Sequence, residues 1–186
     1  KNVTIDSRED NILNDNKKNF KDIKSWRRSE VLKDFKFYII SLNMLAMPWI
    51  ATGVFIYQSF IAESKLWGKY IIPQSFMIYS ITSILILIAS GFLVDRFTSR
   101  KLIPFMNLPL LLGLIILYFF DLSYSAYLFF GLLGVSNGLA NVLGASTWAE
   151  IYGVRYLGGI RALTTALMVF STAFGTALFG FLIDNG

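Results

Sequence analysis

Two asparagines in the middle of a long apolar segment have the chemistry to contact a polar solute. Asn137 and Asn141 are four residues apart, so a helix places both amides on one face. An amide donates and accepts hydrogen bonds, and at mid-depth in a membrane it is costly unless it faces other helices or a water-filled cavity. We therefore expect the pair either to join neighbouring helices, for roughly 1 kcal/mol, or to line a solute path.

Further polar side chains occur in the same apolar segments and extend this candidate site. Single Ser and Thr residues carry less weight than the amides, because their hydroxyls can bond to the preceding helical turn. The predicted cavity residues are Asn137, Asn141, Tyr57, Gln58, Tyr79, Thr172 and Asn43.

A second group of candidate residues is charged and follows the second apolar segment. Asp95 stands at the expected end of a helix, where the helix dipole disfavours an anion by up to about 1 kcal/mol. It therefore needs a compensating partner, such as a helix N-terminus or a basic side chain. An ion-paired latch that forms in one conformation and breaks in another would act as a switch, whereas the alternative is a plain loop that sets the topology. The predicted gating-loop residues are Gly91, Asp95, Arg96, Arg100 and Lys101.

The composition excludes several kinds of chemistry. The sequence has no cysteine and no histidine, which removes disulfides, thiolate metal sites and imidazole catalysis. The apolar segments also contain no Asp, Glu, Lys or Arg, so an acid–base set within them is lacking. We expect no enzymatic activity, no cofactor and no metal site. The net charge of +5 does not indicate nucleic-acid binding, because the basic residues cluster beside apolar spans without a nucleic-acid motif.

Five segments are long and apolar enough to cross a bilayer, which takes about 20 residues per helix. Only 16% of the residues are charged, against about 25% in soluble domains. Backbone groups in lipid must be satisfied within their own segment, so we predict an all-α membrane protein, a polytopic helical bundle. Residues 1–36 form a leader and residues 37–186 the transmembrane domain. The predicted spans are 37–60, 71–94, 102–120, 124–148 and 162–183.

The basic residues predict how the bundle is oriented, because cytoplasmic loops carry an excess of Lys and Arg. The leader holds ten basic residues, and we place it in the cytoplasm. Alternating spans then leave only Lys65 and Lys69 outside. The same five spans put the other basic loop residues on the leader's side, namely Arg96, Arg100, Lys101, Arg155 and Arg161. Because an odd number of spans ends outside, we expect at least one further helix.

The segment GFLVDRFTSRK, from Gly91 to Lys101, resembles the signature G-x-x-x-D-R-x-G-R-[RK] of the major facilitator superfamily. That signature joins the second and third helices of the family and recurs, more weakly, between the eighth and ninth. The Asp-Arg pair and Arg100 are in register with it. Thr98 and Ser99 depart from it, since the family often has Gly and Arg there.

The resemblance covers about residues 37–186 and implies helices seven to eleven of a twelve-helix transporter. The leader would be the linker between two halves, and the missing N-terminal half would be a partner, together with the lipid bilayer and a small-molecule substrate. The implied function is secondary active transport of a small polar or anionic solute by alternating access. Trp148 to Arg161 is similar to a loop of bacterial monocarboxylate-carrier-like members, which implies a bacterial inner membrane. A non-transporting five-helix membrane subunit or scaffold is the alternative.

Overall fold

The structure of the chain, a computed structural model, describes residues 26–185. Most of the predicted leader therefore lies outside the described residues. Within the described range every element is helical and no strand occurs. The helices are α2 (Arg28–Val31), α3 (Phe35–Ile56), α4 (Gln58–Ser64), α5 (Ile71–Phe97), α6 (Ser99–Leu102), the 3-10 helix η1 (Ile103–Phe105), α7 (Leu108–Phe119), α8 (Ser123–Tyr152) and α9 (Leu157–Asn185).

Five of these helical stretches in the described chain are long and apolar enough to cross a membrane. Four are single helices, α3, α5, α8 and α9, and the fifth runs from Ser99 to Phe119 through α6, η1 and α7. This result confirms the prediction of an all-α polytopic bundle. The chain is an integral, multi-pass membrane protein.

The helices differ from the predicted spans chiefly at their ends. α3 continues past Pro48 and stops at Ile56, and Tyr57 separates it from α4. α8 continues to Tyr152, and α9 begins at Leu157, so Glu150 and Arg161 lie within helices and not in the connection between them. The apolar run marks only the part of a helix at hydrocarbon depth. Charged residues extend a helix beyond that depth, where its end is solvated.

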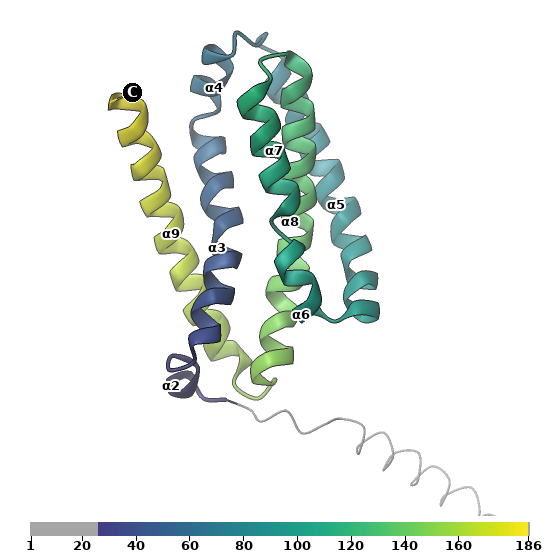
Figure 1. The fold of residues 1–186 in the computed structure, drawn as a ribbon, viewed down its shortest axis with the longest axis vertical. Helices are drawn as coiled ribbons and strands as arrows, with labels where there is room; N and C mark the ends of the chain where they lie inside the picture. The colour runs from purple at the N-terminus through teal and green to yellow at the C-terminus, as the bar shows by residue number, and fades with distance from the viewer. Residues whose placement is uncertain (1–25, 186) are drawn as a thin grey trace, which may run out of the picture.

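α8 is the centre of the packing. α5 and α7 lie along it, and α3 pairs mainly with α9 (Figure 1). The contact between α5 and α8 is close because α8 has glycines there: a Cβ on Gly138 would stand 2.8 Å from the Ser83 carbonyl oxygen, and one on Gly134 would stand 2.5 Å from that of Tyr79. Small residues let two backbones approach in this way.

Different short helices and connections lie at the two ends of the bundle. α2, α6 and the α8–α9 connection lie at one end, here called the α6 end, and α4 lies at the other, the α4 end (Figure 1). At the α6 end a buried apolar cluster contains Val31, Phe37, Trp148, Tyr152 and Ile160. The segment before α3 is thus packed against the ends of α8 and α9, and Trp148 of this cluster also lines the cavity described next.

Candidate functional site

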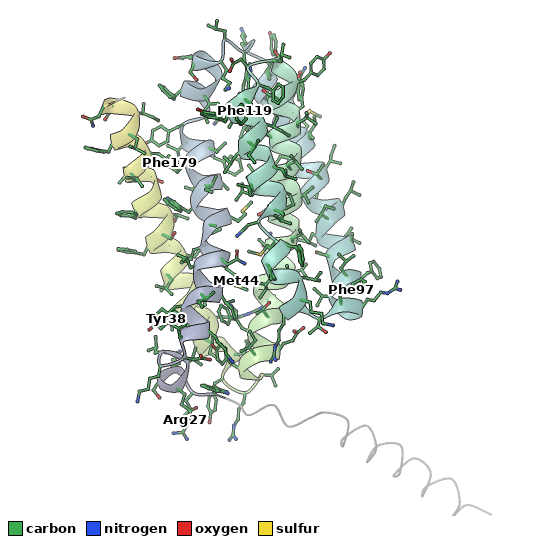
Figure 2. The ribbon with its side chains drawn as sticks, in the orientation of Figure 1. Arg27, Tyr38, Met44, Phe97, Phe119 and Phe179 are labelled. Carbon is green, nitrogen blue, oxygen red and sulfur yellow. The ribbon has the colours of Figure 1, made fainter. Side chains whose placement is uncertain are left out.

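A cavity of about 370 Å³ lies between α3, α8 and α9, in the part of the bundle toward the α6 end. Its apolar wall includes Met44, Pro48 and Trp148; Figure 2 labels Met44 on α3, with Tyr38 and Arg27 nearer the α6 end. The polar and charged residues that line the cavity are Ser41, Asn137, Asn141, Arg161, Thr164 and Thr165. An apolar pocket with a few convergent polar groups is the usual form of a small-molecule site.

The two asparagines of α8 both line this cavity, and they also have hydrogen-bond partners. The Asn137 amide donates to Ser83 Oγ of α5 at 2.8 Å. The Asn141 amide donates to the Asn137 backbone carbonyl at 2.9 Å, and its side chain is exposed. Asn137 therefore joins two helices as well as facing the cavity, whereas Asn141 is the freer of the two for a solute.

α9 contributes a positive charge that the sequence analysis assigned to a loop. Arg161 is in the second turn of α9, and the Thr164 hydroxyl donates to its backbone carbonyl at 2.9 Å. Arg161, Thr164, Thr165 and Met168 all line the cavity. They follow the i, i+3, i+4, i+7 spacing of one helix face, and that spacing could have found the charged residue.

Two other predicted cavity residues form hydrogen bonds elsewhere in the bundle. The Asn43 amide donates to the Ile103 carbonyl at 3.0 Å, and the Asn107 amide donates to Asn43 Oδ1 at 2.7 Å. The Tyr57 hydroxyl donates to the Thr176 carbonyl of α9 at 3.1 Å. Hydrogen bonds of Asn43 thus connect α3 to the third span. Tyr57, which lies between α3 and α4, connects that point of the chain to α9.

The remaining three predicted cavity residues are also spread apart. Gln58 lines an open pocket of about 860 Å³ at the α4 end, together with Glu63 and Lys69. Tyr79 packs edge-on against Phe55 with ring centroids 5.4 Å apart. Thr172 donates to the Val169 carbonyl of its own helix at 2.9 Å. Of the seven predicted residues, the structure brings only Asn137 and Asn141 together at the cavity.

The predicted gating loop lies at the α6 end, and all four of its charged residues are exposed, although one of them, Arg100, bonds to α8. Asp95 and Arg96 are exposed, and within residues 26–185 neither forms an ion pair. Gly91 and Asp95 line a groove with Asn141 and Ala145 of α8. Lys101 is exposed. Arg100 donates to the backbone carbonyl of Glu150, at the end of α8.

Glu150 is a second residue that the sequence analysis did not select. Its Oε1 accepts a hydrogen bond of 3.0 Å from the backbone N–H of Ser99, the first residue of α6. The Ser99 hydroxyl donates to Ser146 Oγ at 2.5 Å. A carboxylate at the start of a helix satisfies an N–H that has no partner within the helix. The contact that holds the loop is therefore made by Glu150, and not by Asp95.

The fold and the cavity define a class of protein: a polytopic helical bundle with a solute-sized space between its helices that a few polar groups line, as in membrane transporters. The sequence model of the Major Facilitator Superfamily matches residues 8–186. The chain therefore belongs to this superfamily, whose members are transporters and not enzymes. No curated protein matches the chain, and no solved structure does so.

Proposed function

We propose that this chain carries a small polar or anionic solute across the membrane by secondary active transport. Membership of the superfamily supports transport in general. The observation that carries the proposal is the cavity between α3, α8 and α9, in which two amides and a guanidinium share a space of about 370 Å³. The two asparagines lie within the apolar part of α8, where polar groups are costly in lipid, and a solute path accounts for their presence.

We further propose that residues 37–186 form helices seven to eleven of a twelve-helix transporter. The N-terminal half of the same transporter would then be the partner that covers the open side of the cavity, and the two halves would alternate access by rocking. The α6 end would face the cytoplasm, because the basic residues Arg96, Arg100, Lys101 and Arg155 lie at that end. The resemblance of residues 148–161 supports the further proposal of a bacterial inner membrane and a monocarboxylate-carrier-like branch of the family.

In this mechanism the loop at the α6 end is the gate. The groove beside Asp95 and the polar cavity lie on either side of one stretch of α8, and Asn141 and Ala145 line both. A movement of this stretch therefore changes both spaces. Asp95 and Arg96, which are exposed in this conformation, are available to pair with basic or acidic groups of the other half in another conformation.

The test is uptake by the full-length protein that contains these residues, reconstituted in liposomes with radiolabelled lactate, succinate and glucose as probes. The double variant Asn137→Ala/Asn141→Ala should lose most of the uptake of whichever probe is carried. Asn185→Ala is the matched control, because Asn185 is exposed and bonds only to its own helix, at the Phe181 carbonyl.

Two outcomes would contradict the proposal. Equal uptake by the double variant and by the control would remove the asparagines from the path. A protein that folds and inserts but catalyses no exchange or uptake of any probe would favour the alternative, a membrane subunit or scaffold that transports nothing.

A further inference from the structure

We propose that the cavity takes an anionic solute and that Arg161 binds the solute's negatively charged group. This inference rests on the proposed transport function and names the class of substrate. Among the described residues that line the cavity, Arg161 is the one charged side chain. A space of this kind has a net positive charge at every physiological pH, because arginine does not lose its proton in proteins.

The guanidinium of Arg161 is free to bind a ligand. Within residues 26–185 its side chain has no hydrogen bond and no ion pair, although it has five N–H donors. The described acidic side chains at this end of the bundle are engaged or placed elsewhere. Glu30 accepts from the Arg27 N–H, and Asp34 accepts from the Tyr152 hydroxyl. Glu150 accepts from the Ser99 N–H, and Asp95 lines the groove on the α5 side of α8.

The cavity also has a buried hydroxyl that lacks a partner. Ser41 of α3 is 5% exposed, and its Oγ forms no hydrogen bond. Burying a polar atom without a partner is unfavourable, so this hydroxyl is suited to donate a hydrogen bond to a bound acceptor. Ser41 and Asn141 can supply donors to an anion, while Arg161 supplies the charge.

The chemistry of these groups favours a carboxylate over a cation or a neutral solute. A planar guanidinium matches a carboxylate through two parallel hydrogen bonds. An anion that gives up water on entering a mostly apolar cavity needs a countercharge and further donors, and the cavity lining supplies both. A cationic solute would be repelled by the unpaired guanidinium.

The competing role for Arg161 is to set membrane topology or to contact lipid headgroups. Arg155 supplies the matched control for that role. Like Arg161, it is exposed; it lies in the α8–α9 connection, six residues before Arg161 in the sequence, and stands beside the Tyr156 ring. It does not line the cavity. Arg155 can therefore report the effect of losing a positive charge at this end of the bundle, and Arg161 the additional effect of losing one from the cavity.

The experiment compares carboxylates with their neutral amides, as lactate with lactamide and succinate with succinamide. The purified full-length protein is assayed for the rise in thermal unfolding temperature that each probe causes and, in liposomes, for uptake. We expect carboxylates to stabilise the protein and to be carried, with amides much weaker. Arg161→Gln should weaken the carboxylate effect at least about tenfold, because a hydrogen-bonded charge is lost. Arg155→Gln should leave it unchanged, and Arg161→Lys should restore part of it, because Lys keeps the charge without the planar fork.

The outcomes separate this inference from the proposed function. Uptake of amides equal to that of carboxylates, or an equal effect of Arg161→Gln and Arg155→Gln, overturns the anion site and leaves transport intact. Stabilisation by carboxylates that depends on Arg161, without uptake, keeps the anion site and overturns transport. If no carboxylate stabilises the protein or is carried, the anion site is overturned. If Arg161→Gln does not fold, Arg161→Lys decides: unchanged carboxylate stabilisation and uptake would show that the guanidinium does not bind the solute.

Discussion

Glu150 Oε1 accepts a hydrogen bond of 3.0 Å from the backbone N–H of Ser99, which joins the last turns of α8 to the first residue of α6. Arg100 and the Ser99 hydroxyl add two further bonds between the same segments. The loop with the family-like motif is therefore held to α8 by its second half, Ser99 and Arg100. Its first half, Asp95 and Arg96, remains exposed.

We predict that Glu150→Ala destabilises the protein by about 1–2 kcal/mol, because Ser99 N–H loses its acceptor, and lowers the rate of uptake by loosening the gate. Thermal unfolding of the purified protein and initial uptake rates measure the two effects. Glu150→Gln is the control, since it keeps an acceptor oxygen but removes the charge. A Gln variant as unstable as the Ala variant would mean that the charge matters and the hydrogen bond does not.

Asn137→Ala should impair uptake while expression stays normal. It should also cost about 1 kcal/mol of stability, the scale of a hydrogen bond between membrane helices. Ser83→Ala separates the two roles, because it removes the same hydrogen bond and leaves the amide in the cavity. We expect it to lower the unfolding temperature but to spare uptake. Should Ser83→Ala reduce uptake as much as Asn137→Ala does, the asparagine acts through packing and does not contact the solute.

Gly138→Ala should destabilise the contact between α5 and α8 by about 1–3 kcal/mol, the usual cost of overpacking. The added methyl group would stand 2.8 Å from the Ser83 carbonyl oxygen and 2.9 Å from Ile86 Cβ. Gly144→Ala on the same helix is the matched control, because nothing lies within 4 Å of its Cβ position. It should leave the unfolding temperature unchanged or slightly raised. Equal losses in both variants would show that α8 and α5 are not packed as described.

The orientation of the bundle can be tested with single introduced thiols, because residues 1–186 contain no cysteine. Ser64→Cys at the α4 end and Val154→Cys in the α8–α9 connection both lie at exposed positions. In intact cells an impermeant maleimide should label the thiol at position 64, whereas the thiol at position 154 should react only after the membrane is opened. Labelling of both thiols in intact cells, or the reverse pattern, would contradict the proposed placement of the α6 end in the cytoplasm.

The five membrane helices could be predicted from the sequence, because a run of about 20 apolar residues is long enough to span the hydrocarbon core and is rare in water-soluble folds. The helix ends could not be predicted in this way. α9 begins at Leu157, inside a stretch with glycines and charges, so hydropathy placed its start five residues late and left Arg161 in a loop. The charged residue of the cavity was missed for that reason.

The hydrogen-bond partners of the polar side chains could not be predicted from the sequence either. Asn43 bonds to Asn107 across 64 residues, and Tyr57 bonds to Thr176 across 119. A polar residue in an apolar segment predicts an interior face, but it does not say whether a helix or a solute is opposite. Asn137 and Asn141 could be placed together because their spacing lies within one helix.

Tyr152 at the end of α8 is bonded to both ends of the segment that precedes α3. Its backbone carbonyl accepts from the Trp26 N–H at 3.0 Å, and its hydroxyl donates to Asp34 Oδ2 at 3.1 Å. One residue at the end of α8 thus holds both ends of the segment that leads into α3, through its backbone carbonyl and its side chain. If α3 tilts away from α8 at this end, it must either break these bonds or carry the segment with it. A movement of the segment at Trp26 is therefore transmitted to the last turn of α8, one helical turn from Trp148 in the wall of the cavity.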